Sequence, residues 1–259
     1  MIDKTAIVSK KAKLGSFVTV GAFSIIGDGV EIGSNVQIGN HCNIIGNTSI
    51  GDSCKILTGA VVGSIPQDLK YKGEKSFLNI GNKNIIREYV TINPGTSEGS
   101  STRIGNDNLF MAYSHVAHDC KVGNNCTIAN SGTLAGHVVI EDCVVIGGLA
   151  AIHQFCRIGK FSIIGGCSKV VQDVIPFSMC DGNPARICGI NLVGLRRSGF
   201  NREEIIDIKK SIKLLFFSGH VKAKALVQIK DSVDLSENIG HLIDFVQSSQ
   251  RGLCRSKKE

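Results

Sequence analysis

Residues 14–44, LGSFVTVGAFSIIGDGVEIGSNVQIGNHCNI, place an aliphatic residue at every sixth position. The series runs Leu14, Val20, Ile26, Ile32, Ile38 and Ile44, and a glycine follows most of its members. An amphipathic helix repeats its apolar positions every 3.6 residues and a half-buried strand every two, so neither explains the pattern. A step of six indicates a coil with three sides, each formed by one short strand and one turn, so that every third step returns to the same side.

The same step governs most of the chain, over residues 8–62, 80–92 and 104–170. Small residues recur four places after the aliphatic positions, which predicts small buried fillers inside the coil. They include Ala12, Cys42, Cys54, Ala60, Cys120, Cys126 and Cys156. We therefore predict a parallel β-helix in which these cysteines are packing residues rather than ligands.

Two segments depart from the six-residue step: 64–79 (SIPQDLKYKGEKSFLN) and 93–103 (NPGTSEGSSTR). Both are polar or rich in turn residues, so we expect loops that leave the coil. The second is rich in glycine and serine and is expected to be mobile. Loops on a rigid scaffold often carry function.

The step ends near Pro184, so we expect the β-helix to span residues 1–183 and a small α-helical domain to span 184–259. Asn201 and Glu204 have the spacing of a capping box at a helix start, and Gly219 stands where a C-cap belongs.

Further helices are expected near residues 221–230 and 236–249. With them, the sequence predicts an all-β parallel β-helix followed by a small helical domain.

The formal net charge of the 259 residues is +7, and much of the excess lies late in the sequence. The late basic residues are Arg196, Arg197, Lys209, Lys210, Lys222, Lys224, Arg251, Arg255, Lys257 and Lys258. They form either a solvated surface or an attractive field for an acidic partner or a phosphate-bearing ligand. Nucleic acid is not an expected partner, because no recognition motif or aromatic-studded basic stripe occurs.

The ten cysteines are scattered and form no CxxC motif. The first residues, MIDKTAIVSK, lack the apolar core of a signal peptide, and no apolar run reaches transmembrane length. These features predict a reduced, cytoplasmic protein without a membrane span.

Positions 18 apart stack on successive coils, and this rule gathers the polar residues of SHVAHDC, 114–120, with others. His118, Gly136 and Gln154 share one column, and Asp119 shares the next with His137. His115 is expected on the same strand as His118, and His153 lies one step away from this column on the other side. We therefore expect four of the seven histidines to meet in one functional patch.

Two chemistries compete for this patch. Imidazoles from neighbouring chains or coils could hold zinc, as in the γ-class carbonic anhydrases, but the H-x4-H pattern of those enzymes is absent. The alternative is general-base catalysis by His118, with Asp119 fixing the imidazole and the amide of Gly136 steadying an oxyanion. A purely structural β-helix is a third interpretation, which the histidine patch disfavours.

Eight segments make the second chemistry specific. They are IPQDLKY, IREYVTIN, MAYSHVAHDC, TLAGHV, GGLAAIHQFCRIG, GGCSKVVQDV, DGNPA and GLRRSGF, in this order. The chain resembles the UDP-N-acetylglucosamine O-acyltransferases, which open lipid A biosynthesis, over nearly its whole length. The resemblance implies a left-handed β-helix and transfer of an (R)-3-hydroxyacyl group from acyl carrier protein to the glucosamine 3-hydroxyl. It also implies that no metal or cofactor takes part.

Position by position, the resemblance implies that His118 is the base, Asp119 its partner and the Gly136 amide the oxyanion site. It further implies a set of substrate-binding residues. These are Asp68, Lys70, His115, His137, His153, Gln154, Asn191 and Arg197, the last two near the nucleotide. Asn93 departs from the family, where many members carry histidine, which puts a ligand contact there in doubt.

Gly148 and Gly166 share one column. Each glycine either eases a turn or leaves a groove along the outside of the coil for an acyl chain. In the family, a residue at the place of Gly166 stops the acyl tail, and a small one implies longer chains. The family also implies a homotrimer with sites between subunits.

The nearest alternative is the N-acyltransferase of the same pathway, whose members carry an additional N-terminal domain, whereas this chain enters its repeats by Val8.

Overall fold

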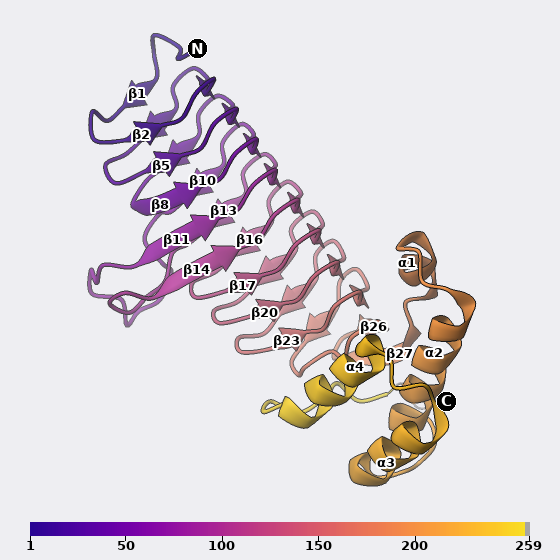
Figure 1. The fold of residues 1–259 in the computed structure, drawn as a ribbon. Helices are drawn as coiled ribbons and strands as arrows, with labels where there is room; N and C mark the ends of the chain where they lie inside the picture. Colours follow the sequence, from indigo (N-terminus) through magenta and orange to yellow (C-terminus); the bar gives the residue numbers. More distant parts are fainter. Residues whose placement is uncertain (257–259) are drawn as a thin grey trace.

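A computed structural model describes residues 1–256 of the chain. Over this range, short strands form three sheets, and the chain visits the sheets in turn to build a left-handed β-helix (Figure 1). Strands on successive coils pair in parallel, as in Ile7–Val8 with Ile25–Ile26. Ile25 lies three steps of the repeat after its partner Ile7, which confirms the coil length that the sequence predicts.

The strands of each sheet have the following bounds. The first sheet holds β1 (Ile7–Val8), β4 (Ile25–Ile26), β7 (Asn43–Ile44), β10 (Val61–Val62), β13 (Thr91–Ile92), β16 (His115–Val116), β19 (Thr133–Leu134), β22 (Ala151–Ile152) and β25 (Lys169–Val170). The second holds β2 (Lys13–Leu14), β5 (Glu31–Ile32), β8 (Asn47–Ile50), β11 (Phe77–Ile80), β14 (Ser101–Ile104), β17 (Lys121–Val122), β20 (Val139–Ile140) and β23 (Arg157–Ile158). The third holds β3 (Thr19–Val20), β6 (Gln37–Ile38), β9 (Lys55–Ile56), β12 (Ile85–Ile86), β15 (Leu109–Phe110), β18 (Thr127–Ile128), β21 (Val145–Ile146), β24 (Ile163–Ile164), β26 (Ser178–Gly182) and β27 (Ala185–Ile190).

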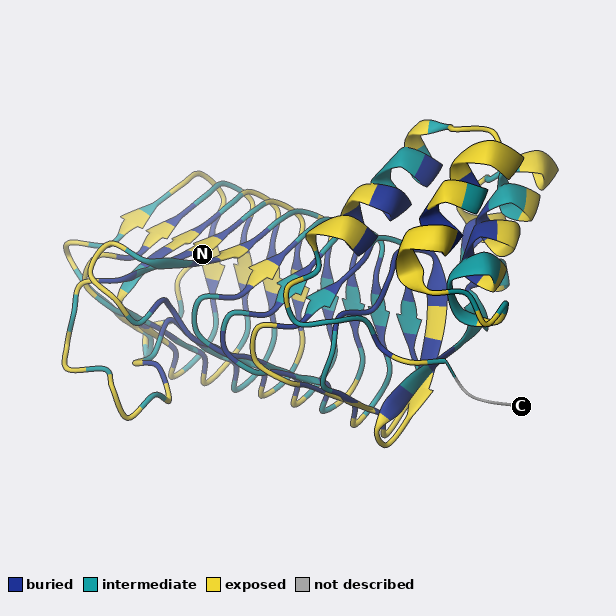
Figure 2. Ribbon diagram, turned by 90° about the horizontal axis from the view of Figure 1, so that it is seen from below, coloured by how far each residue is buried: buried dark blue, intermediate teal, exposed yellow. Residues whose placement is uncertain are grey.

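The second residue of most strands points inward, which explains the six-residue step. On the first sheet the fully buried column is Ile26, Ile44, Val62, Ile92, Val116, Leu134, Ile152 and Val170. Figure 2 shows the resulting stripes of buried residues along the coils. Because each coil buries the same kind of side chain at the same place, the core forms one continuous rod.

The cysteines predicted as fillers lie in this rod. Cys42, Cys54, Cys120, Cys126 and Cys156 are all buried. Burial raises the pKa of Cys120, Cys126 and Cys156 to about 12, so these thiols stay protonated at neutral pH. Their packing role is confirmed.

Both loops leave the coil where the sequence predicts. Val61 pairs with Thr91, and Thr91 with His115, so these two coils are longer than a regular coil of three steps. Each loop is shorter than expected, however, because β11 already begins at Phe77 and β14 at Ser101. The last residues of both expected loops are therefore strand residues.

The β-helix ends in an antiparallel pair, β26 with β27, which extends the third sheet to Ile190. The first residues after Pro184, expected in the helical part, thus belong to a strand. The helices are α1 (Leu192–Arg197), α2 (Arg202–Phe216), α3 (Lys222–Ser232) and α4 (Glu237–Ser248). No helix in residues 1–256 has the length and apolar character needed to cross a membrane.

The expected capping box at the start of α2 is confirmed. Asn201 Oδ1 accepts a hydrogen bond from Glu204 N at 2.9 Å, and Glu204 Oε2 accepts one from Asn201 N at 3.0 Å. The expected C-cap is wrong by two residues, because α2 ends at Phe216 with Phe217 as its C-cap. Gly219 instead adopts a left-handed φ of 73° in the connection that follows.

Helix α4 packs against the second sheet near the end of the β-helix (Figure 1). His241 Nε2 lies 2.7 Å from Glu141 Oε2, and the Arg157 guanidinium lies 4.4 Å from the centroid of the Phe245 ring. The segment after α4 then runs beside the last coil, where Leu253 bridges to Asp173. These contacts join the helical part to the coils that carry the candidate site.

Candidate active site

The histidine patch forms at the corner between the first and second sheets. His137 N donates to His118 O at 3.0 Å, and Phe155 N donates to Gly136 O at 3.2 Å, so successive corners stack directly. The corner residues Asp119, His137 and Phe155 have left-handed φ values of 58°, 60° and 65°. This turn geometry places their side chains in one column, as the spacing of 18 predicts.

His118 and Asp119 form a hydrogen-bonded dyad. His118 Nδ1 lies 2.9 Å from Asp119 Oδ2, and the side chains are only 13% and 10% exposed. A carboxylate can only accept, so Nδ1 donates the hydrogen bond, and in the neutral ring with this tautomer Nε2 carries the lone pair. A neutral imidazole held this way can act as a general base at Nε2. His118 lies in the corner after β16 rather than in the strand of His115.

The imidazole of His118 lies directly over Gly136. A Cβ atom at position 136 would collide with the ring, including Nε2 at 2.5 Å. Only glycine therefore allows His118 this position. The corner turn also leaves the Gly136 N–H without an acceptor among residues 1–256.

Asp119 is held as a carboxylate. Burial raises the pKa of Asp119, but hydrogen bonds from His118, Thr96 and Ser100, together with the charge of His137, outweigh burial and keep the pKa below its ordinary value of 3.8. The dyad therefore keeps its negative partner throughout the neutral range.

His115 lies beside the dyad and is held by the neighbouring coil. Its Nδ1 lies 2.7 Å from Thr91 Oγ1, and burial, reinforced by His118, lowers the pKa of His115 below 6.5. This imidazole is therefore neutral at pH 7. The Thr91 contact follows from the pairing of β13 with β16.

His137 and Phe155 extend the patch toward the C-terminal coils. The His137 ring stacks on Phe155 with centroids 4.7 Å apart, and meets the His118 ring edge-on at 5.1 Å. Phe155 was not among the residues predicted for the patch. Its spacing of 18 from His137 was the signal that could have identified it.

His153 and Gln154 lie on the next coil, and both are exposed. His153 Nδ1 lies 2.8 Å from Arg251 Nη2, while Arg251 Nε donates to Val171 O at 2.9 Å. The C-terminal segment therefore reaches the rim of the site. No repeat rule predicts this contact, because Arg251 lies outside the coils.

The first loop brings Asp68 to the dyad. Asp68 Oδ2 lies 3.7 Å from His118 Nε2, on the side opposite Asp119. Lys70 follows two residues later with its side chain exposed, and its backbone N–H donates to Asp68 Oδ1 at 2.9 Å. The loop thus places a carboxylate beside Nε2 of the dyad.

Asn93 lies behind the same loop. Its side chain is buried, and Nδ2 donates to Ser64 O at 3.1 Å and lies 3.3 Å from Ile65 O. The amide therefore holds the start of the first loop. Thr96, three residues further on, was also not among the predicted site residues, although it contacts Asp119 directly.

Asn191 is the N-cap of α1 and Arg197 is its last residue, beyond the last coil (Figure 1). The Asn191 amide is engaged in structure, since Oδ1 accepts from Gly194 N at 3.1 Å and Nδ2 donates to Phe161 O at 2.8 Å. Arg197 is exposed in the last turn of α1. The histidine patch of the same chain lies on other elements, β16 to β22.

Gly148 and Gly166 stack on the corner between the third and first sheets. A Cβ atom at position 148 would meet only Asn130 O, at 3.4 Å, and one at position 166 only Gly148 O, at 3.3 Å. Neither glycine has a left-handed φ. The turn therefore does not demand glycine at either position, and a Cβ at each would make one close contact, with a backbone carbonyl of the preceding coil.

His118, Asp119 and His137 are also a possible ligand set for a metal, since their donor atoms lie within 4.8 Å of one another. Asp119 Oδ2, however, already accepts from His118 and from Thr96. This hydrogen bonding is that of an oriented base.

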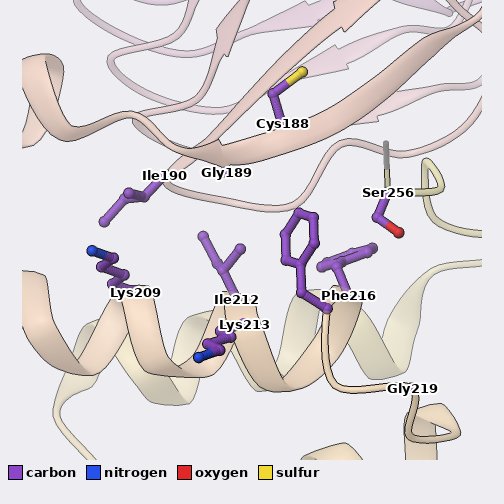
Figure 3. Close-up of a pocket in the computed structure, with 10 residues that line it drawn as sticks. Cys188, Gly189, Ile190, Lys209, Ile212, Lys213, Phe216, Gly219 and Ser256 are labelled. Atoms are coloured by element: carbon purple, nitrogen blue, oxygen red, sulfur yellow. The ribbon is translucent and has the colours of Figure 1, made fainter. Parts of the chain in front are cut away.

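A separate hollow of about 850 Å³ lies between β27 and α2, away from the histidines. In Figure 3, Ile212 and Phe216 rise from α2 toward the strand that carries Cys188. Lys209 and Lys213 also line the hollow. This hollow combines an apolar floor with a basic rim.

Comparison with known proteins adds family relationships to this geometry. The profile described as bacterial transferase hexapeptide (six repeats) matches residues 101–136, and that of Udp N-acetylglucosamine O-acyltransferase, domain 2, matches residues 173–254. The acyl-[acyl-carrier-protein]–UDP-N-acetylglucosamine O-acyltransferase of Aliarcobacter butzleri is 48% identical, over 99% of each chain. Its counterpart in Xanthomonas euvesicatoria is also 48% identical, over 98% of each chain.

Solved structures of UDP-N-acetylglucosamine acyltransferases are similar to this chain over nearly its whole length. LpxA from Acinetobacter baumannii has a TM-score of 0.94 at 42% identity and covers 98% of this chain and 99% of its own. The UDP-N-acetylglucosamine acyltransferase of Bacteroides fragilis has a TM-score of 0.97 at 40% identity, covering 98% of this chain and 100% of its own.

A hexapeptide β-helix with a histidine–aspartate dyad on its corner defines a hexapeptide-repeat transferase. The chain belongs to the acyl-[acyl-carrier-protein]–UDP-N-acetylglucosamine O-acyltransferase family.

Proposed function

We propose that this enzyme transfers an (R)-3-hydroxyacyl group from acyl carrier protein to the 3-position of UDP-N-acetylglucosamine, the first step of lipid A biosynthesis. The observation that carries the proposal is the His118–Asp119 dyad, with Nε2 free and the ring packed over Gly136. Family membership names the acyl donor and the sugar acceptor.

The chemistry can be carried by these residues alone. His118 Nε2 removes the proton of the sugar 3-hydroxyl as its oxygen attacks the thioester carbonyl. Asp119 stabilises the imidazolium, and the unpaired N–H of Gly136 donates to the oxyanion of the tetrahedral intermediate. Collapse breaks the carbon–sulfur bond, and the carrier thiolate takes the proton back from His118.

The remaining site residues are proposed to bind substrate. Asp68 lies closest to Nε2, so we assign it to the sugar hydroxyls, with Lys70 beside it. His115, His137, His153 and Gln154 line the same patch on neighbouring coils. Arg197 is proposed to contact the diphosphate, and Asn191 to act by capping the start of the helix that presents Arg197.

The acyl chain is proposed to lie along the corner of Gly148 and Gly166. The support is that neither glycine is required by its own turn, and that Gly166 is exposed on the outside of the coil. On the same corner, Leu149 next to Gly148 is 67% exposed. A hydrocarbon tail could bury this surface.

A homotrimer is proposed because one chain leaves this corner uncovered. Phe23, Tyr89 and Tyr113 are 59%, 50% and 62% exposed along it, and Tyr89 stacks on Tyr113 at 5.2 Å. Exposed apolar stripes of this kind mark association surfaces. A neighbouring subunit on this edge would roof the acyl groove.

Acyl carrier protein is proposed to dock on the basic face around α2. Lys209 and Lys213 line the hollow of Figure 3, and Arg196 and Arg202 line an adjoining one. These cations match an acidic partner. A cytoplasmic location is proposed from the free state of all ten cysteines.

The deciding experiment is an acyltransferase assay of the purified protein. Hydroxyacyl carrier proteins of graded chain length are offered with two acceptors, the 3-hydroxyl sugar nucleotide and its 3-amino analogue. We expect transfer to the 3-hydroxyl acceptor and loss of transfer in His118→Ala. A protein that transfers no acyl group to either acceptor would overturn the proposal.

A further inference from the structure

Two imidazoles compete for one carboxylate in the site. Asp119 Oδ2 lies 2.9 Å from His118 Nδ1 and 3.8 Å from His137 Nε2. Both rings can present an N–H to a carboxylate. Because Oδ2 already lies this close to both nitrogens, a small rotation of the Asp119 side chain would exchange a hydrogen bond to His118 for one to His137. Something other than the dyad itself must hold the carboxylate on His118.

Thr96 supplies that restraint. Its Oγ1 donates to Asp119 Oδ2 at 2.8 Å, and its backbone N–H donates to the same oxygen at 3.2 Å. Hydrogen bonds to an ionised acceptor are stronger than neutral ones, and little water competes because the Asp119 side chain is only 10% exposed. Thr96 and His118 thus fix this oxygen from two elements, the second loop and the corner after β16.

The loop that carries Thr96 is itself tied down. Gly95 N donates to Phe77 O at 3.2 Å, and Gly99 N donates to Lys75 O at 2.9 Å. Ser97 N donates to Ser100 Oγ at 2.9 Å, which closes the turn between these anchors. The segment expected to be mobile therefore has the hydrogen bonds needed to place one hydroxyl at a defined point.

We propose that Thr96 is a positioning residue that holds Asp119 on His118 and away from His137. The inference rests on the proposed function, because it assigns the second loop a task in the same general-base chemistry. Thr96 acts through Asp119: its hydroxyl donates to that carboxylate, and within residues 1–256 it makes no hydrogen bond to His118 or His137.

The first test is kinetic. Thr96→Val keeps the size and the backbone N–H but removes the hydroxyl, and should lower kcat on the order of tenfold while both KM values stay within about twofold. Thr96→Ser restores the hydroxyl and should return kcat to near wild type. Ser97→Ala is the matched control, because Ser97 is an exposed residue of the same loop. Equal losses in the serine and valine variants would overturn the proposal.

The second test separates positioning from a general loop defect. In an Asp119→Ala background, Thr96→Val should cost no further kcat, since the group it acts on is gone. The same tenfold loss in both backgrounds would show a merely structural role and overturn the inference.

A measurement on the protein without substrate tests the role of Thr96 independently of acyl transfer. The low-field proton resonance of the His118 Nδ1–H, assigned by its loss in His118→Ala, should persist in Thr96→Ser and weaken in Thr96→Val. An unchanged resonance in Thr96→Val would contradict the positioning role. Absence of acyl transfer by the wild-type protein would instead overturn the proposed function.

Discussion

Replacing Gly166 with methionine should shorten the preferred acyl chain while leaving the dyad intact. The new Cβ would meet only Gly148 O, at 3.3 Å, and the backbone at Gly166 has no left-handed φ to oppose a side chain. The fold should therefore accept methionine with a small local adjustment. Its side chain would project into the space outside the coil where we place the acyl tail.

The size of the effect follows from the coil spacing. Successive coils lie roughly 4.8 Å apart, and an extended chain advances about 1.2 Å per bond. A side chain that blocks one coil level therefore displaces about four methylenes. At about 0.8 kcal/mol per buried methylene, the longest accepted donor should lose about 3 kcal/mol, or on the order of 10²-fold in kcat/KM.

The assay is competition among hydroxyacyl carrier proteins of graded length, with products resolved by mass. The preferred length should fall by about four carbons, and kcat for the new preferred donor should stay near the wild-type value. Gly240→Met is the control, because it adds the same side chain on α4, where nothing lies within 4 Å of the added Cβ. An unchanged chain-length profile in Gly166→Met would refute the groove assignment, though not the acyltransferase proposal.

Three further predictions concern the base, the assembly and the donor. His118→Ala should lower kcat by roughly 10²–10⁴ with much less effect on acceptor binding. Asp119→Ala should lower kcat less, because Asp119 only orients the imidazole that accepts the proton. A kcat of His118→Ala within a few-fold of wild type would point to another base. Sedimentation should show a trimer, and an active monomer would end the shared-site proposal. The KM for the donor should rise with salt through the physiological range, where the screening length is about 8 Å. The double substitution Lys209→Ala and Lys213→Ala should make the donor KM less dependent on salt. A donor KM that does not change with salt would count against electrostatic docking.

The sequence by itself determined the β-helix and the centre of the site. One six-residue unit repeats, so the position of each side chain on a coil follows from its number alone. That is why the stacking of His118 over Gly136, and of Asp119 beside His137, could be predicted by counting three steps of the repeat along the chain. The buried cysteines followed from the same count.

The left hand of the coil did not follow from the period and came from family resemblance. The predicted bounds of the two loops and of the helical part were less accurate, because the six-residue step does not define them either. The strands β11 and β14 begin inside the expected loops, and β27 lies inside the expected helical part, because pairing with an adjacent strand, not the six-residue step, sets their bounds.

Only the tertiary structure decided what the segments outside the repeat do. Asp68 and Thr96 reach the dyad from two loops whose path is set by hydrogen bonds between the loops. The six-residue repeat does not predict these hydrogen bonds. Arg251 meets His153 across 98 positions of sequence, through a tail that returns to the last coil. What surrounds Gly148 and Gly166 likewise depends on which neighbouring atoms approach them, a property that a residue's own identity and spacing do not contain.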